Sequence, residues 1–463
     1  MTLPDPDQLL ADAPRVREVL DAAGWSAAAL DELLGATYRT HLDREELAPV
    51  LRRTAGGSPL EQLARQLILG VPGSSELPAS WLSPDGSARV RLQPVVSGGV
   101  EVVVPHDAGR VADPEQVLGV GAASMTLAAA TPRRTIGRTL DLGAGSGVQA
   151  LLAEDHSAAV VATDRNPRAV SYARLAAALN GLELDVRQGD LLEPVAGERF
   201  DLVVSNPPFV ISPGASYTYR DAGLAGDDVC RRLVQELPGV LASEGVAVLL
   251  VNWLHLLGED GDERVRSWVP TGCDAWIVQR ELAAPQEYVT AWLRDSDENA
   301  RFGELYDAWM NGLERMRVEA VAFGVVALRP GRGEVVLDVV DQPVAASWGA
   351  EVLDHFARRD ALAEGVLDRA WRLREDVRLH QVAVREDDGW YVESQLLQQS
   401  AGLRWSGGTD EHGAALLAGC DGMVPLRMLF SLLAVSAGIP EEEAVEQGLP
   451  VVQRLVEQGF LVP

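Results

Sequence analysis

The first 75 residues repeat apolar side chains at three- and four-residue spacing, which is the period of an α-helix. Three such stretches, residues 16–24, 27–35 and 58–70, each close on a glycine, a residue that commonly ends a helix. The pattern predicts a helical N-terminal domain over residues 1–76.

A Pro/Gly/Ser-rich connector comes next, and two runs of strand-forming residues follow it, 88–95 and 100–107. A Ser-Gly-Gly turn at residues 97–99 separates the two runs, as in a β-hairpin. Residues 77–112 are therefore predicted to form a strand-pair connector.

Short apolar runs alternate with helical segments from residue 139 onward. Five of these runs read as strands: 139–145, 159–164, 184–190, 200–206 and 246–253. The alternation predicts an α/β domain, residues 113–341, with a mostly parallel sheet and helices on both faces. A further run at 275–282 is followed by two more, 320–328 and 334–341, joined by Pro-Gly-Arg-Gly, and this last pair predicts an antiparallel edge hairpin.

Residues 342–463 read as a separate accessory domain. A long helix is expected over 349–375, followed by strands at 378–384 and 389–397, and the chain closes with two or three helices and a short strand. This order resembles a winged helix, so the fold class expected here is α+β.

Charge changes the picture of possible partners. The 463 residues carry 40 basic and 68 acidic side chains, and all the basic ones are Arg. Of the net charge of −28, residues 256–463 alone carry −17. Phosphate backbones repel such a surface, so a nucleic-acid partner requires a local Arg-rich patch. The acid load of the C-terminal domain favours a protein partner there.

The remaining composition limits location and metal chemistry. No run of about 18 apolar residues exists, and the start lacks a basic stretch followed by an apolar one, so neither a membrane span nor a secretory signal is expected. Cys230, Cys273 and Cys420 are odd in number and far apart, and the His residues are scattered singly. We therefore expect a cytoplasmic protein with no disulfide framework and no protein-bound metal.

A glycine-rich loop follows the first strand of the parallel sheet. It reads Asp141-Leu142-Gly143-Ala144-Gly145-Ser146-Gly147, and such glycines let the backbone turn tightly and approach a ligand. A dinucleotide fingerprint requires glycine where Val148 stands, which weakens an NAD interpretation. Asp164, at the end of the next strand, can hold both ribose hydroxyls. A tight turn and a helix N-cap are the structural alternatives for these two elements.

Two more elements end the third and fourth strands. After the third, Asp190 can accept a hydrogen bond from an adenine amino group while the backbone N–H of Leu191 meets a ring nitrogen, although Gly-Asp is also a turn pair. After the fourth comes Ser205-Asn206-Pro207-Pro208-Phe209. The Asn206 side-chain oxygen and the Pro207 carbonyl can accept both hydrogens of one planar NH₂ group, and Phe209 can stack on its planar carrier. The carboxyl edge of an open α/β sheet is where ligands bind.

Taken together, the four elements resemble the class I S-adenosylmethionine-dependent methyltransferases with an (N/D)PP(Y/F) motif. This amino-methylating group includes release-factor glutamine N5-, ribosomal-RNA guanine N2- and adenine N6-methyltransferases. The resemblance covers roughly residues 113–330 and implies a seven-stranded Rossmann-like sheet whose last hairpin is reversed.

The resemblance also implies roles for single residues. Gly143 and Gly145 pass the methionine part of the cofactor, and Asp141 supports it. Asp164 binds the ribose, Asp190 and Leu191 the adenine. As the catalytic group it implies Asn206, Pro207 and Phe209, with Asn206 gripping the target nitrogen. Residues 124–128 resemble a helix that closes over the cofactor.

The methyl acceptor has three candidates. An exocyclic RNA base amine of the guanine N2 type ranks first, because Phe209 replaces the Tyr of the glutamine branch and several Arg residues lie near the sheet: Arg133, Arg134, Arg138, Arg165 and Arg168. A protein glutamine ranks second, because a helical N-terminal domain joined by a strand pair resembles the glutamine enzymes. A small-molecule amine is third, and a non-catalytic scaffold is the least favoured reading. Two further features leave alternatives open. The Gly-rich segment 211–228 is expected either to close over the substrate or to be a plain surface loop. Trp253 is expected to be either a core side chain or a wall of the pocket.

Overall fold

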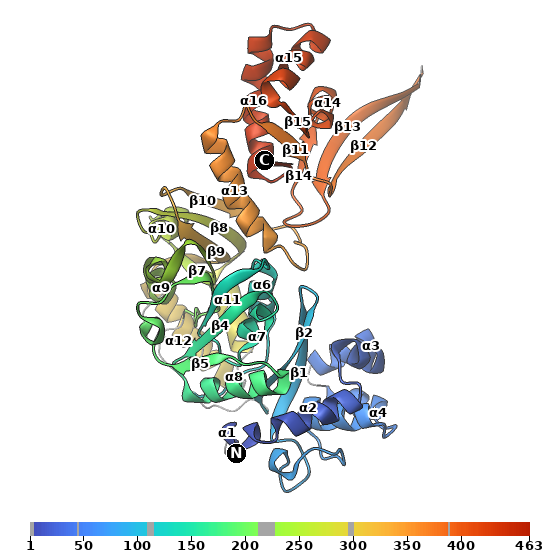
Figure 1. Ribbon diagram of the computed structural model, residues 1–463, viewed down its shortest axis with the longest axis vertical. Coiled ribbons are helices and arrows are strands. Elements are labelled where there is room, and N and C mark those ends of the chain that lie inside the picture. The colour runs from blue at the N-terminus through green and yellow to red at the C-terminus, as the bar shows by residue number, and fades with distance from the viewer. Residues whose placement is uncertain (1–3, 44–45, 109–114, 212–226, 295–300, 388) are drawn as a thin grey trace. The chain divides into compact units, whose positions relative to one another are not determined.

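The computed structural model describes residues 4–43, 46–108, 115–211, 227–294, 301–387 and 389–463 (Figure 1). The chain divides into two compact units. The first comprises residues 1–128 and 133–339, and the second comprises residues 129–132 and 340–463. The finer boundaries expected at residues 76, 112 and 341 stay predictions.

The N-terminal part of the first unit is helical and ends in a strand pair. Its elements are α1 (Asp7–Leu10), α2 (Ala13–Ala22), α3 (Ala27–Asp43), α4 (Leu47–Arg53), α5 (Pro59–Leu63), the π-helical turn η1 (Ala64–Ile68), the 3₁₀ turn η2 (Ala79–Trp81), β1 (Val90–Ser97) and β2 (Val100–Asp107). β1 and β2 pair antiparallel. Gly98 (φ 60°) and Gly99 (φ 85°) make the turn between them, because a two-residue hairpin of this hand needs positive φ at both positions. The expected helices and strand pair are confirmed.

The N-terminal helices share a hydrophobic core with a helix of the α/β part, α8 (Pro167–Asn180). Leu9, Val16 and Trp81 pack in one buried cluster with Tyr172 and Leu175 of α8. The helical region therefore covers one side of the α/β part within a single unit.

The central sheet has eight strands in the order β10-β8-β9-β7-β6-β3-β4-β5. Their bounds are β3 (Ile136–Leu142), β4 (Ser157–Asp164), β5 (Asp185–Gln188), β6 (Phe200–Ser205), β7 (Leu241–Leu256), β8 (Cys273–Ala283), β9 (Val318–Pro330) and β10 (Val335–Val339). β9 runs antiparallel to β7 and β8, and the other neighbouring pairs are parallel. The expected mostly parallel, Rossmann-like sheet is confirmed.

Helices cover both faces of this sheet (Figure 1). In addition to α8 they are α6 (Ala122–Ala130), α7 (Val148–Ala153), the 3₁₀ turns η3 (Glu193–Val195) and η4 (Leu237–Val240), α9 (Asp228–Glu236), α10 (Gly261–Arg266), α11 (Pro285–Arg294) and α12 (Phe302–Arg315). Val160 and Ala162 of β4 face α7 and α8, whereas Val161, between them, faces the cluster that holds α9 and α10. Alternating side chains of β4 thus point to opposite faces of the sheet and pack into two separate hydrophobic cores.

The predicted edge hairpin is wrong. β9 and β10 do not pair with each other, because both edges of β9 are already taken: Leu328 has Ala247 of β7 on one side and Ala275 of β8 on the other. The chain instead crosses β8 and lays β10 parallel to its outer edge. This adds an eighth strand to the seven that were expected.

The second unit is α+β with its own core. Its elements are α13 (Ala350–Glu364), β11 (Ala370–Leu373), β12 (Val377–Glu386), β13 (Gly389–Gln399), β14 (Ser406–Thr409), α14 (Glu411–Ala418), β15 (Asp421–Pro425), α15 (Leu426–Ala437), α16 (Glu441–Glu457) and β16 (Leu461–Val462). The strands form two three-stranded sheets, β15-β11-β16 and β12-β13-β14. The detailed likeness to a winged helix stays a prediction.

The helix expected over 349–375 is shorter than predicted. It ends at Glu364 because Gly365 adopts a φ of 125°, which no helix continues through. Trp371, which lies within the predicted range, is a buried strand residue, and its indole N–H donates to the Val366 carbonyl at 2.9 Å.

Two features bear on location. No helix among the described residues is long and apolar enough to cross a membrane. Cys230, Cys273 and Cys420 are buried and carry free thiols. The cytoplasmic location expected from the sequence stays a prediction.

Candidate active site

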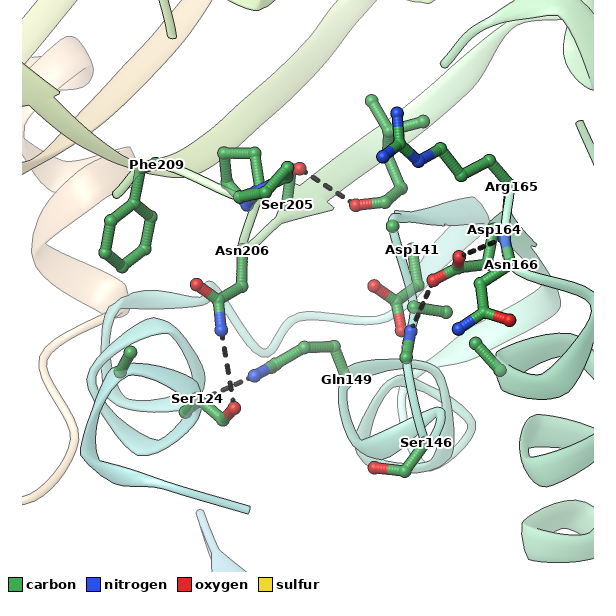
Figure 2. Close-up of a pocket in the computed structure, with 18 of the residues that line it drawn as sticks. Ser124, Asp141, Ser146, Gln149, Asp164, Arg165, Asn166, Ser205, Asn206 and Phe209 are labelled. Atoms are coloured by element: carbon green, nitrogen blue, oxygen red, sulfur yellow. Dashed lines mark hydrogen bonds between the residues drawn. The ribbon is translucent and has the colours of Figure 1, made fainter. Parts of the chain in front are cut away.

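A cavity of about 610 Å³ opens at the carboxyl ends of β3, β4 and β6 (Figure 2). It is lined by all nine residues to which the resemblance gave a cofactor-binding or catalytic role: Asp141, Gly143, Gly145, Asp164, Asp190, Leu191, Asn206, Pro207 and Phe209. Parallel strands end at a common edge, so residues that are up to 68 positions apart in the sequence meet here. The volume is in the range of a small-molecule site.

The glycine loop presents bare backbone to the cavity. The N–H groups of Gly143 and Ala144 both donate to the Thr163 carbonyl at 2.9 Å, which ties the loop to β4. Gly143 (φ 74°) and Gly145 (φ 55°) have a left-handed backbone, and a Cβ added to either would meet nothing within 4 Å. A ligand can therefore come close to this stretch of main chain.

Asp141 is a buried carboxyl group beneath the loop. It is 1% exposed, and its Oδ2 accepts a hydrogen bond from the Ala150 N–H at 2.9 Å. Burial raises the pKa of Asp141 to about 7, and the nearby Asp164 adds to the rise. Asp141 can therefore change its protonation near neutral pH.

Asp164 bridges the loop and the start of α8. Its Oδ2 accepts from the Gly145 N–H at 2.9 Å and its Oδ1 from the Asn166 N–H at 2.8 Å. Burial raises the pKa of Asp164, while these two backbone hydrogen bonds lower it. Each carboxylate oxygen has a second lone pair left for a ligand hydroxyl.

The third strand end is more open. Asp190 is exposed, and Leu191 has a positive φ of 46°, unusual for a branched side chain. The Gly189 N–H donates to the Asp164 carbonyl at 3.0 Å, so this turn is joined to the one that carries Asp164.

The Asn-Pro-Pro-Phe segment is held from several sides. Ser205 donates its hydroxyl to the Leu142 carbonyl at 2.8 Å, and the Asn252 side chain donates to the Phe209 carbonyl at 3.2 Å. The Asn206 Nδ2 donates to the Ser124 hydroxyl at 3.4 Å (Figure 2). The ring of Phe209 meets Trp292 edge-on, with centroids 6.2 Å apart.

Sequence reasoning missed several lining residues. Asn166 lies two residues after Asp164, so its place beside the cavity could have been predicted from the strand end. Gln149 lies on α7 and donates to the Ser124 carbonyl at 2.7 Å. Trp292 lies on α11, far along the chain, and the sequence carries no signal that brings it back to this edge.

Other expectations have mixed outcomes. Trp253 is fully buried in the sheet core and does not line the cavity, so the core interpretation is confirmed. Residues 212–226, with Tyr217, Tyr219 and Arg220, lie outside the described residues. Residues 122–124 at the start of α6 line the cavity, near the helix that was expected to close over the cofactor.

Three of the five Arg residues near the sheet have partners within the protein. Arg138 pairs with Glu198 at 2.6 Å, and Arg168 pairs with the buried carboxylate of Asp107. Arg133 is half-buried and donates to the Ser97 hydroxyl at 3.1 Å. Two of the five charges that favoured RNA are thus paired with carboxylates of the protein.

The cavity fits S-adenosylmethionine. The backbone at Gly143 and Gly145 leaves room for the methionine part, and Asp164 offers acceptors for two ribose hydroxyls. The Thr163 hydroxyl is buried in the cavity wall and has no hydrogen-bond partner among the described residues, so it is available to a ligand. These residues would hold the cofactor, which supplies an activated methyl group.

Comparisons with known proteins agree with this geometry. A family model described as "Methyltransferase small domain" matches residues 118–254. Two models described as domains of unknown function, DUF7059 and DUF7782, match residues 22–100 and 352–463.

Three curated relatives are similar to part of this chain. A release factor glutamine methyltransferase of Deinococcus radiodurans is 40% identical over 126 residues, 24% of this chain and 44% of the relative. A ribosomal RNA small subunit methyltransferase C of Alcanivorax borkumensis is 34% identical over 116 residues, 25% of this chain and 32% of the relative. The protein named "Putative protein N5-glutamine methyltransferase" of Methanocaldococcus jannaschii is 30% identical over 164 residues, 33% of this chain and 80% of the relative.

The chain thus spans less than half the length of the first two relatives and most of the third. One solved structure, a Thermus thermophilus 16S rRNA N2 G1207 methyltransferase with AdoMet and guanosine, is 26% identical with a TM-score of 0.28, covering 39% of this chain and 45% of that one. The extent of the archaeal match and the methyltransferase small domain together show that the chain belongs to the family of S-adenosylmethionine-dependent N-methyltransferases.

Proposed function

We propose that this chain transfers the methyl group of S-adenosylmethionine to the side-chain amide nitrogen of a protein glutamine. The observation that carries the proposal is the position of Asn206 and Pro207 at the same cavity as Asp141 and Asp164. A cofactor held by the two carboxylates and a planar NH₂ group held by the Asn-Pro pair would meet within one site.

In this reaction the chain has to position and polarise the nucleophile. An amide nitrogen shares its lone pair with the adjacent carbonyl, which makes it a weak nucleophile. The Asn206 Oδ1 and the Pro207 carbonyl would accept its two hydrogens, which favours a pyramidal nitrogen whose lone pair points at the methyl carbon. The N–C bond would form as the C–S bond of the cofactor breaks, with the bonding pair going to sulfur, and the nitrogen would then lose one proton to solvent. Orientation and fixed dipoles of this kind supply much of an enzymatic rate.

The protein acceptor now ranks above RNA. RNA was favoured by the Arg residues near the sheet, but Arg138 and Arg168 are paired with Glu198 and Asp107. A protein acceptor also agrees with the names of the Deinococcus and Methanocaldococcus relatives. The acidic second unit supports the same choice as a contact for a protein partner.

An RNA base amine is the second candidate. The relative named as a ribosomal RNA methyltransferase supports it, as does Phe209 in place of the Tyr of the glutamine branch. Both acceptors present a planar NH₂ group, so the Asn206–Pro207 geometry serves either.

The test is methyl transfer from labelled S-adenosylmethionine into a cell extract divided into RNA, protein and small-molecule fractions. We expect label in the protein fraction with the wild-type chain and none with Asn206→Ala. The variant should still bind S-adenosylhomocysteine, which shows that its pocket is intact. Label in RNA would overturn the glutamine proposal, and equal labelling by Asn206→Ala would overturn the role of Asn206.

A further inference from the structure

One segment of the first unit runs along the cofactor cavity from end to end. We call it the strap, residues 115–124, and nearly all of it lines the cavity: Gln116, Val117, Leu118, Gly119 and Gly121–Ser124. Its first residue is joined to the ribose side of the site, because the Glu115 carbonyl accepts from the Asn166 side chain at 3.0 Å. Its last residue is joined to the target side, because Ser124 accepts from Asn206 at 3.4 Å.

Most of the strap has no regular secondary structure, so it must be held by other parts of the protein. Asp107, the last residue of β2, binds it at Val117: the Val117 N–H donates to the Asp107 Oδ2 at 2.8 Å, and the Asp107 N–H donates to the Val117 carbonyl at 3.0 Å. Gln93 of β1 binds it three residues later. The Val120 N–H donates to the Gln93 Oε1 at 2.9 Å, and the Gln93 Nε2 donates to the Val120 carbonyl at 3.1 Å.

Asp107 is itself rigidly placed. Its carboxylate is 2% exposed and accepts from the Arg168 Nε at 2.9 Å and from the Tyr172 hydroxyl at 2.6 Å. Burial, together with the neighbouring Asp107, raises the pKa of Tyr172, so the phenol stays protonated as the donor. Arg168 and Tyr172 lie on α8, the helix that Asn166 caps. Through Asp107, the strap is therefore anchored to α8, the same helix that follows the ribose-binding turn.

We infer that Asp107 and Gln93 are positioning residues for cofactor binding: the strand pair β1–β2 holds the strap over the S-adenosylmethionine site. Neither side chain lines the cavity, so each acts only through the backbone of the strap. The inference rests on the cofactor part of the proposed function and is independent of the acceptor.

The test measures S-adenosylhomocysteine binding by isothermal titration calorimetry, which needs no methyl acceptor. Gln93→Leu removes both of its hydrogen bonds to Val120 at nearly constant side-chain size. We expect the affinity to fall about tenfold, as the loss of one or two ordered hydrogen bonds implies. Asp107→Asn leaves one side-chain oxygen, which can accept from Val117 or Arg168 but cannot satisfy all four donors. We expect it to lower the affinity at least as much as Gln93→Leu does.

The matched control is Asp274→Asn. Asp274 is also a buried carboxylate with many donors: the Arg329 Nη2 at 3.0 Å and the N–H groups of Arg332 at 2.8 Å and Glu334 at 3.0 Å. It lies near the start of β8, at the edge of the sheet opposite to the cavity. We expect this variant to lower the melting temperature and leave the S-adenosylhomocysteine affinity unchanged.

The outcomes separate the two claims. A wild-type chain that does not bind S-adenosylhomocysteine would overturn the proposed function itself. Wild-type affinity in folded Gln93→Leu would overturn the positioning role alone. Equal losses of affinity in Gln93→Leu and Asp274→Asn would also overturn it, because the effect would then follow general stability. Should Asp107→Asn not fold, Gln93→Leu decides the matter.

Discussion

The Oδ2 atom of Asp164 accepts a hydrogen bond from the backbone N–H of Gly145 at 2.9 Å. The carboxylate that we propose binds the ribose thus also fixes the glycine loop beside it. Its other oxygen is bonded to the Asn166 N–H at 2.8 Å, so one side chain organises two walls of the cavity.

Replacing Asp164 by Ala should therefore weaken cofactor binding more than the loss of a ribose contact alone would. Two backbone donors and the ribose hydroxyls lose a charged acceptor, and we expect about a hundredfold loss of affinity. Asp190→Ala is the comparison, because Asp190 is exposed and the described structure gives it no such role in the loop. Equilibrium dialysis with labelled S-adenosylmethionine measures both, and a larger loss for Asp190→Ala would contradict the assignment.

The end of the cavity that we propose holds the methyl acceptor allows a second prediction. Trp292 lines the cavity and packs edge-on against Phe209. Trp292→Ala should raise the KM for the methyl acceptor by up to about tenfold, since aromatic contacts contribute on the order of 1 kcal/mol, and leave S-adenosylhomocysteine affinity unchanged.

Trp309→Ala serves as the control for Trp292. Trp309 packs with Tyr288 in the same aromatic cluster, at a centroid distance of 6.4 Å, but it does not line the cavity. Steady-state labelling of the acceptor fraction compares the two variants. A KM that rises equally in both would show that Trp292 acts through the packing of the cluster and not through the acceptor.

Much of this site could be predicted because it follows from chain order. Asp141, Asp164, Asp190 and Asn206 each end a strand of one parallel sheet, and consecutive strand ends meet whatever the intervening helices do. Trp292 has no such link, since it lies on a helix whose orientation depends on packing around Phe209 and Phe323.

The same holds for the fold: its strands follow from the local sequence, whereas their pairing depends on packing. The alternation of apolar runs predicts every strand of the central sheet, but it carries no information on which neighbour a strand pairs with. β9 and β10 look like a hairpin because four residues join them, yet β9 is paired on both edges, with β7 and β8. The strap was missed for a related reason: nothing in the sequence distinguishes its partners, Gln93 and Asp107, from the other polar residues of the strands β1 and β2.

Two glycines of the loop should respond differently to the same substitution. Gly147 has a φ of 84°, and an added Cβ would lie 3.3 Å from the Cα and Cβ of Ala173, so Gly147→Ala should cost about 1–2 kcal/mol of stability. Gly143 has a φ of 74° but open space around an added Cβ, so Gly143→Ala adds a methyl group where we propose that the cofactor passes. We expect similar thermal shifts for both variants, but a marked loss of S-adenosylhomocysteine affinity only for Gly143→Ala. Equal affinity losses would contradict this placement of the cofactor.

Asp141 gives the free protein a defined pH response. Its pKa is raised by burial from an ordinary value of 3.8 to about 7. Between these values the unfolded chain has released the proton while the folded chain still holds it, so the folded state binds more protons. The contribution of Asp141 to the free energy of unfolding therefore falls as pH rises from about 4 to about 7. Denaturant titrations across this range should show a flatter pH dependence for Asp141→Asn than for the wild type.

Cofactor binding should reverse the protonation preference of Asp141. The methionine end of the cofactor carries an ammonium group, and a nearby positive charge favours the ionised carboxyl, so binding lowers the pKa of Asp141. Below about pH 7 binding then releases a proton, and the affinity should rise with pH until the free protein is already ionised. Calorimetry at pH 6 in two buffers of different ionisation enthalpy measures the released protons. Asp141→Asn should release fewer, and an unchanged release would mean that the proton comes from another group, for which the half-buried Asp164 is the first to test.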